Sequence, residues 1–252
     1  MLGLALPEQV FAFLLVFARL GTLIMLLPAL GESAVPPRVR LSLALVISFI
    51  MVALVGGALP AMPNTPFTLF FLLFGEILIG LMIGGSIRLM MSALHVAGTI
   101  IAYNSGLAAA QAFDPAQGMQ SAIFSTFLTL LGTLFIFATD LHLLMIAAMH
   151  DSYDVFPPGR VPEARDFATM AIQTVANSFR LGVQMGAPFI VFGLVFNIGL
   201  GMVARLMPQL QVFFIAMPLN IILGFVILMF VIGAMMAWFV RHVEDVIAIF
   251  MV

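Results

Sequence analysis

Long stretches without a charged residue alternate with short polar breaks along the chain. Residues 41–75 and 206–240 are uncharged runs of 35 positions each. A helix needs about 20 apolar residues to cross the hydrocarbon core of a membrane, so each run is long enough for at least one span. Turn-forming residues such as Pro60 and Pro63 divide the first run. The pattern predicts helices at about residues 8–29, 39–57, 66–93, 94–112, 120–149, 166–179, 180–206 and 209–250.

The most polar segment of the chain runs from His150 to Asp166 and contains Pro157-Pro158-Gly159. Three consecutive turn-forming residues inside a polar stretch are typical of a loop. We therefore expect an exposed loop here, followed by a short amphipathic helix at about residues 166–179.

Composition decides what surrounds these helices. Hydrophobic residues make up 63% of the 252 residues and charged residues only 8%. In soluble domains about half of the residues are hydrophobic and about one quarter are charged. A soluble fold could not hide so much apolar surface, so the surroundings must be lipid or other hydrophobic protein. The expected fold class is all-α, a membrane-type helical bundle.

Charge and cysteine content exclude several functions. The formal net charge is −2, so no basic excess indicates nucleic-acid binding. The chain has no Cys, which excludes disulfides, thiolate catalysis and Cys-based metal sites. It also lacks the nucleophile-elbow, phosphate-loop and zinc-protease motifs. We expect no catalytic residue, no cofactor and no metal site.

Several charged or polar residues lie within or beside the apolar runs. A charge at the centre of a bilayer costs about 2.5–3.5 kcal/mol on insertion scales, so each should face protein or water. They could relay ions or protons, or they could pair between helices inside an assembly. No regular array of acids follows one helix, which favours pairing. The residues expected to pair are Arg19, Glu76, Arg88, Asp140, His142 and Arg205.

Small residues recur at helical spacing in three places. Such faces let the backbones of membrane helices approach closely. The neighbouring helix could belong to the same chain or to a partner. The residues expected to pack are Gly80 and Gly84, the four-residue repeat Gly98, Ala102, Gly106 and Ala110, and the pair Gly182 and Gly186.

A break in the middle of the chain combines turn residues with large apolar side chains. Asp114-Pro115 followed by Gly118 is strong turn chemistry. The segment is either an ordinary surface hairpin loop or a loop that lines or closes a cavity. Irregular backbone at membrane depth is tolerated only where it is enclosed by protein or lines a cavity.

Four groups of residues carry a more specific pattern and together span nearly the whole chain. They are residues 17–21 with 35–41, residues 75–81, residues 113–115 with 140–142, and residues 199–213 continuing to Pro218. The last is the most specific, because it combines Gly-Leu-Gly-Met-Val-Ala-Arg-Leu with Met-Pro-Gln-Leu-Gln-Val-Phe. On these residues the chain resembles the FliR/SctT family of type III export-gate membrane proteins, with the flagellar branch favoured by overall similarity.

The resemblance implies a structural role inside a larger assembly. One copy of such a protein joins about five FliP-like and about four FliQ-like subunits in a helical cone around a protein-export pore. Further implied partners are FlhB-like and FlhA-like export components, exported unfolded proteins and membrane lipids. The implied location is the flagellar basal body in the bacterial inner membrane. Enclosure in such a cone would explain the buried charges better than lipid contact.

The resemblance also implies a division of the chain. Residues 1–206 would be FliP-like and residues 207–252 a FliQ-like helical hairpin, integrated into one unit. The pore plug would lie in the gate loop near residues 109–119. Its expected members are Phe113, Asp114, Pro115, Gln117 and Met119.

A secondary transporter or ion channel that acts alone is the alternative function. Transporters of this kind often carry inverted repeats with broken helices at matching places in both halves. Pro28 and Pro188 could mark such places, but their flanking sequences share nothing. An intramembrane enzyme would need converging acids or histidines, which the sequence does not offer. The two functions can be separated by purification. A chain that is stable alone would favour the transporter, and a chain that is stable only with its partners would favour the export gate.

Overall fold

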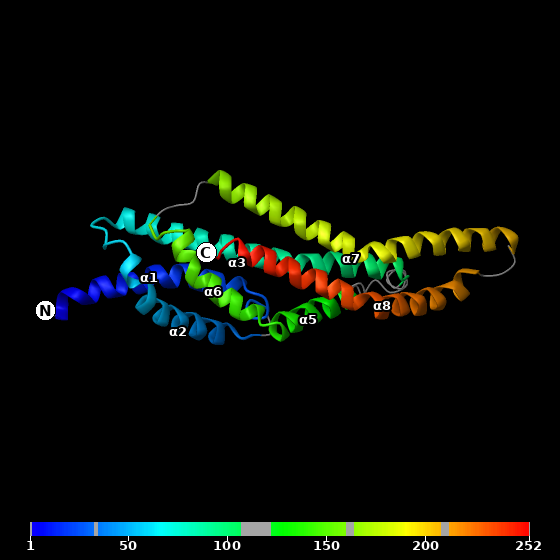
Figure 1. Cartoon of the computed structure of the whole chain (residues 1–252), viewed down its shortest axis with the longest axis horizontal. Helices are drawn as coiled ribbons and strands as arrows, with labels where there is room; N and C mark the ends of the chain where they lie inside the picture. Colours follow the sequence, from blue (N-terminus) through cyan, green and yellow to red (C-terminus); the bar gives the residue numbers. More distant parts are fainter. Residues whose placement is uncertain (1, 33–34, 107–121, 160–163, 208–211, 252) are drawn as a thin grey trace. The chain divides into compact units, whose positions relative to one another are not determined.

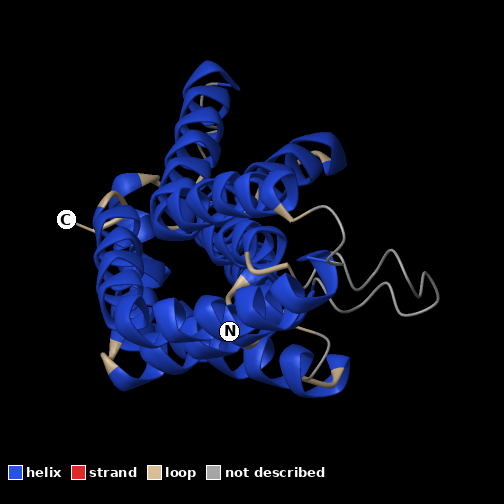
Figure 2. Ribbon diagram, turned by 90° about the vertical axis from the view of Figure 1, so that its right-hand side faces the viewer, coloured by secondary structure: helices blue, strands red, loops and turns tan. Residues whose placement is uncertain are grey.

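The computed structural model of the chain describes residues 2–32, 35–106, 122–159, 164–207 and 212–251. Every element in these ranges is a helix, and none of them contains a strand (Figure 2). Five of the helices are long and apolar enough to cross a membrane, or up to six if a broken pair counts as one span. The predicted fold class, an all-α membrane-type bundle, is confirmed.

Figure 1 shows the helices coloured in chain order. In chain order they are α1 (Leu2–Leu26), α2 (Pro37–Val55), the short 3-10 helix η1 (Gly56–Ala58), α3 (Pro66–Asn104), α5 (Ala122–Ala138), α6 (Leu141–Val155), α7 (Ala164–Leu206) and α8 (Val212–Ala248).

Proline and glycine set several helix ends. Helix α2 has Pro37 at its first position, where the missing N–H leaves no hydrogen bond unmade. Helix α3 likewise starts at Pro66. After α3 ends at Asn104, Gly106 takes a φ of 76°, a left-handed conformation common just past helix C-termini.

Two predicted helix breaks are wrong because the expected span length was too short. The predicted division at 93/94 does not exist, since α3 is one helix of 39 residues. The division at 179/180 is absent too, since α7 is one helix of 43 residues. Helices of this length are roughly 58–65 Å long, about twice the hydrocarbon thickness of a bilayer. Neither site contains a proline or other breaker, so nothing in the sequence stops the helix.

Two further predictions about helix bounds differ from the structure. The helix predicted at 120–149 is divided at Thr139-Asp140 into α5 and α6. The predicted exposed loop from His150 is helical through Val155, and Ser152 and Tyr153 are buried there. The C-terminal region from residue 207 contains one helix, α8, within the described residues. The division into a FliP-like part and a FliQ-like hairpin stays a prediction.

The chain forms two compact units, and α3, α5, α7 and α8 each contribute a segment to both. Unit 1 comprises residues 1–90, 136–175 and 242–252. Within it α2 contacts both α1 and α6. Its buried side chains include Leu15, Leu20, Leu23 and Ile24 of α1, Ile79, Ile83 and Ile87 of α3, and Phe250 near the C-terminus.

Unit 2 comprises residues 91–135 and 176–241. Its buried side chains come from all four contributing helices, and they include Leu94, Ala97 and Ile101 of α3, Leu128 of α5, Met185 and Phe189 of α7, and Met235 and Phe239 of α8. Much apolar surface stays uncovered outside these cores. Only 11% of the most apolar window of α7 is buried within the chain.

Candidate functional site

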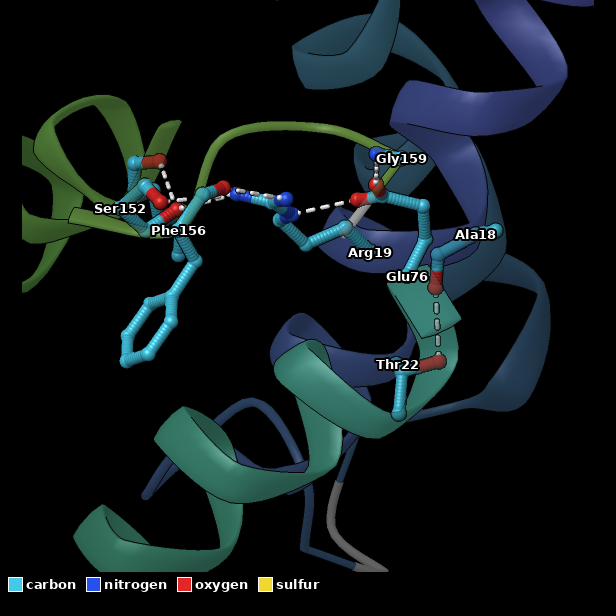
Figure 3. A network of polar contacts seen from close by, with 8 residues as sticks. Ala18, Arg19, Thr22, Glu76, Ser152, Phe156 and Gly159 are labelled. Carbon is cyan, nitrogen blue, oxygen red and sulfur yellow. Dashed lines mark hydrogen bonds and ion pairs between the residues drawn. The ribbon is translucent and has the colours of Figure 1, made fainter. Parts of the chain in front are cut away.

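A fully buried arginine is the centre of the polar network in unit 1. Arg19 of α1 is 0% exposed and Glu76 of α3 is 1% exposed. The Arg19 Nε donates to Glu76 Oε2 at 2.6 Å, a short charge-assisted hydrogen bond (Figure 3). Two charges without this pairing would be very costly to bury, so each requires the other.

The rest of the Arg19 guanidinium binds the C-terminal end of α6. Its Nη1 donates to the Ser152 carbonyl at 2.8 Å, and its Nη2 donates to the Phe156 carbonyl at 2.9 Å. Carbonyls at the end of a helix carry partial negative charge. The Ser152 carbonyl also accepts from the Phe156 N–H at 3.0 Å, so the Arg19 side chain is its second donor. Arg19 therefore satisfies the end of α6 with the donors that Glu76 leaves free.

Two further groups complete the network. Glu76 Oε1 accepts from the Gly159 N–H at 3.4 Å, which ties the loop after α6 to α3. Gly159 has a φ of 88°, a conformation that glycine adopts without strain. The Tyr153 ring lies 4.1 Å from the Arg19 guanidinium carbon, in cation–π geometry.

The Arg19–Glu76 network can hold α1, α3 and α6 together. Its charged groups are used in contacts with one another and with the backbone, so the network itself offers no reactive centre. Both oxygens of the carboxylate and three nitrogens of the guanidinium are used in protein contacts. Across the parts of the chain that the structure describes, no group of three or more His, Asp or Glu side chains could hold a metal ion.

The other residues expected to pair lie elsewhere. Arg88, Asp140 and Arg205 are exposed in this chain, and none has an ion-pair partner among the described residues. The His142 ring lies 5.1 Å from the Phe137 ring, and its buried Nδ1 has no hydrogen-bond partner within the described ranges. Asp140 lies at the break just before α6, where its backbone has a φ of 58°. The structure thus brings together only Arg19 and Glu76 from this group.

The first small-residue pair lies where α3 meets α1 in unit 1. A Cβ atom at Gly80 would overlap the carbonyl oxygen of Arg19. At Gly84 it would lie 2.9 Å from the Leu26 Cβ and 3.0 Å from the Leu23 carbonyl. Both positions are therefore occupied by the only residue that allows this approach.

The remaining small residues pack around the second half of α3 in unit 2. A Cβ atom at Gly98 would overlap the backbone of Ser125 in α5. At Gly182 of α7 it would lie 2.8 Å from the Ala93 carbonyl, and at Gly186 it would lie 2.7 Å from the Ile100 side chain. Ala102 is fully buried. In this chain, α5 and α7 therefore flank α3 through small residues.

Gly106 needs a correction. It was expected to continue the small face of a helix reaching residue 112, but α3 ends at Asn104. Gly106 instead makes the left-handed turn after the helix. Ala110 and the expected plug residues Phe113, Asp114, Pro115, Gln117 and Met119 lie outside the described residues.

Comparison with known proteins assigns the chain to a family. Residues 10–246 match the family model described as bacterial export proteins, family 1. The chain is 45% identical over 237 residues to the flagellar biosynthetic protein FliR of Caulobacter vibrioides, covering 94% of each chain. The chain belongs to the FliR family of bacterial export proteins.

More distant relatives of the FliR family also align over most of their length. The flagellar biosynthetic protein FliR of Aquifex aeolicus is 30% identical over 244 residues, covering 96% of this chain and 93% of its own. The surface presentation of antigens protein SpaR of Shigella flexneri is 24% identical over 226 residues, covering 88% of this chain and 86% of its own. The resemblance to the FliR/SctT family is confirmed.

Sequence reasoning named only two of the six residues of the network in this FliR-family chain. It named Arg19 and Glu76 but not Ser152, Phe156 or Gly159. These three act through backbone atoms, which carry no signal of residue type. One clue was present, since an Arg has more donors than one carboxylate can accept.

Proposed function

We propose that this chain is the FliR-type structural subunit of a flagellar type III export gate in the bacterial inner membrane. The observation that carries the proposal is the 45% identity to the flagellar protein of Caulobacter vibrioides over 94% of both chains. The flagellar relatives stand at higher identity than SpaR, which favours the flagellar branch. The chain performs no bond chemistry and forms part of the channel for unfolded flagellar proteins.

The surface of the chain supports a role inside an assembly. Apolar side chains such as Phe49, Phe67, Phe230 and Leu206 are strongly exposed on four different helices. Helices of 37 to 43 residues are longer than a bilayer is thick, so their ends need cover other than lipid tails. FliP-like and FliQ-like subunits, in about five and about four copies, would provide that cover. FlhB-like and FlhA-like proteins would be neighbours in the export apparatus.

The plug at residues 109–119 stays a prediction, drawn from the sequence and the family resemblance. Apolar constrictions close pores by excluding water, which suits Phe113 and Met119. Deleting residues 110–118 should let small ions leak through an assembled complex. A deletion complex that stays as tight as the parent would remove this loop from the gate.

Co-expression tests the proposed function directly. The tagged chain is purified alone and together with the FliP-like and FliQ-like proteins of the same bacterium. An export-gate subunit should aggregate or be degraded alone and should copurify in one defined complex with both partners. A stable, monodisperse chain that binds neither partner would favour the stand-alone transporter instead.

A further inference from the structure

Residues 156–159, which follow α6, form a short bridge over the buried ion pair of unit 1. Figure 3 shows the backbone arching from Phe156, beside Arg19, to Gly159, beside Glu76. At one end the Phe156 carbonyl accepts from Arg19 Nη2 at 2.9 Å. At the other end the Gly159 N–H donates to Glu76 Oε1 at 3.4 Å. We call residues 156–159 the strap.

The two ends of the strap are held with different strength. At the first end, the Phe156 N–H donates to the Ser152 carbonyl at 3.0 Å, and the Phe156 carbonyl accepts from Arg19. At the second end, the Gly159 N–H makes one hydrogen bond, whose 3.4 Å separation exceeds the usual range of about 2.7–3.2 Å for N–H···O. Because a longer hydrogen bond is weaker, the strap is fixed at Phe156 and loosely held at Gly159.

Proline makes the strap stiff and limits what can hold it. Pro157 and Pro158 have fixed φ angles and no backbone N–H, so Gly159 supplies the one backbone donor of residues 157–159. Gly159 is exposed. A Cβ atom there would lie 3.5 Å from the Leu72 side chain and 3.6 Å from the Pro60 side chain, which are ordinary contact distances. The loosely held end therefore lies at the surface, and the stiff segment can swing about its fixed end as one piece.

Lifting the Gly159 end would leave the ion pair in place. Arg19 Nε would still donate to Glu76 Oε2, and Arg19 Nη1 would still donate to the Ser152 carbonyl. Glu76 Oε1 would lose the Gly159 N–H on the side that the exposed Gly159 covers, where a water molecule can take its place. The movement therefore leaves no charge unpaired, and α1, α3 and α6 stay joined.

We propose that the strap is a moving part of the export gate, which lifts at Gly159 and pivots at Phe156 while the Arg19–Glu76 pair stays closed. This inference rests on the proposed function. A channel for unfolded chains must change shape while its helices stay joined. Hinges in such movements are a few residues in loops or at the ends of elements, which is where Phe156 lies.

A reversible disulfide tests whether the strap must lift. A Cβ atom at Gly159 would lie 3.7 Å from the Pro60 Cβ, close to the mean separation of about 3.8 Å in disulfides. Pro60→Cys combined with Gly159→Cys should therefore lock the strap on oxidation with diamide, and the chain has no other Cys. The double variant is assembled with the FliP-like and FliQ-like subunits under reducing conditions. Export of a flagellar protein is measured before oxidation, after oxidation and after renewed reduction.

The oxidised double variant should stay assembled and lose export, and reduction should restore it. Gly159→Cys alone is the control for the strain of a side chain at a φ of 88°, and it should export equally with and without diamide. Equal export by the double variant before and after the disulfide forms would overturn the inference.

Leu72→Cys gives a second measurement that leaves the strap unchanged and decides the matter if the double variant does not assemble. Leu72 is half-buried beside Gly159. Its thiol should react faster with a charged maleimide when an export substrate is arrested in the complex than in the idle complex, because the lifted strap no longer covers it. Phe70→Cys is the control, since Phe70 is already 63% exposed on the same helix and should react equally in both states.

An equal rate for Leu72→Cys in the idle and the arrested complex would show that the strap stays closed, and the inference would be wrong. Failure of the parent chain to form the complex with its partners is a different result. It would overturn the proposed function itself, and the inference with it.

Discussion

Gly80 of α3 lies directly against the backbone carbonyl of Arg19 in α1, one helical turn from Glu76. This close approach and the ion pair are parts of one contact. Because Gly80 has no Cβ, the two helix backbones come near enough for the Arg19 Nε to reach Glu76 Oε2 at 2.6 Å. The small-residue pattern and the buried-charge pattern, which were separate in the sequence, meet at this point.

Gly80→Ala should weaken unit 1, since its new methyl group would overlap the Arg19 carbonyl. The expected cost is about 1–3 kcal/mol, the usual range for overpacking a tight contact. The measurement is the thermal stability of the detergent-solubilised complex.

Gly85→Ala is the matched control for Gly80. It lies five residues further along the same helix, and a Cβ there would meet nothing within 4 Å. This variant should be neutral or more stable by up to about 1 kcal/mol, because Ala favours helix more than Gly. Equal effects of the two substitutions would refute the close-packing explanation.

Arg19→Met should be more damaging than Glu76→Gln. Losing Arg19 leaves a buried carboxylate unpaired, and it also removes the side-chain donor to the Phe156 carbonyl and one of the two donors to the Ser152 carbonyl. Breaking a buried pair from one side costs about 3–5 kcal/mol. Glu76→Gln keeps a hydrogen-bond acceptor beside Arg19, so a smaller loss of assembly yield is expected.

Arg19→Lys separates the ion pair from the contact with α6. A single ammonium group can stay beside Glu76, but it lacks the fork that reaches both α6 carbonyls at once. Hydrogen exchange should therefore speed up at the Phe156 amide, which bonds to the Ser152 carbonyl at 3.0 Å, while assembly is largely kept. Unchanged exchange in the last turn of α6 would mean that Arg19 does not stabilise this helix end.

Sequence reasoning is most informative where a residue type has few physical options. An Arg in an apolar run must find an acid, and Glu76 is an acid in another apolar run. Gly at four-residue spacing must admit a close neighbour, as at Gly80, Gly84 and Gly182. Such constraints are local to the residue, so they can be read without knowing the fold.

The errors have a different origin. Helix α3 was divided because each helix was expected to match one bilayer thickness, yet its 39 residues contain no breaker that requires an end. The sequence also does not show which arginines are exposed. Arg88 and Arg205 lie beside apolar runs as Arg19 does, but their side chains lie on faces that this chain does not cover. Which face of a long helix is covered depends on its neighbours in three dimensions, and periodicity alone does not supply them.

Asp140 provides a test of this distinction between local and tertiary constraints. Its φ of 58° and ψ of 16° place it in the left-handed region, at the break between α5 and α6. Asp, Asn and Gly adopt this conformation readily, whereas a β-branched residue does so at a cost of about 1–2 kcal/mol. Asp140→Asn and Asp140→Gly should therefore retain the stability of the complex, and Asp140→Val should lower it.

The same substitutions show whether the Asp140 carboxylate pairs with a partner subunit, as its place in an apolar run first suggested. Copurification with the FliP-like and FliQ-like subunits is the measurement. Asp140→Asn keeps the shape and the backbone preference but removes the charge, so intact assembly is expected if the backbone is what matters. Since Asp140 is exposed in this chain and lacks an ion-pair partner among the described residues, the backbone explanation is the one that the geometry favours. Loss of the complex in Asp140→Asn, with Asp140→Val no worse, would instead assign the carboxylate to a contact between subunits.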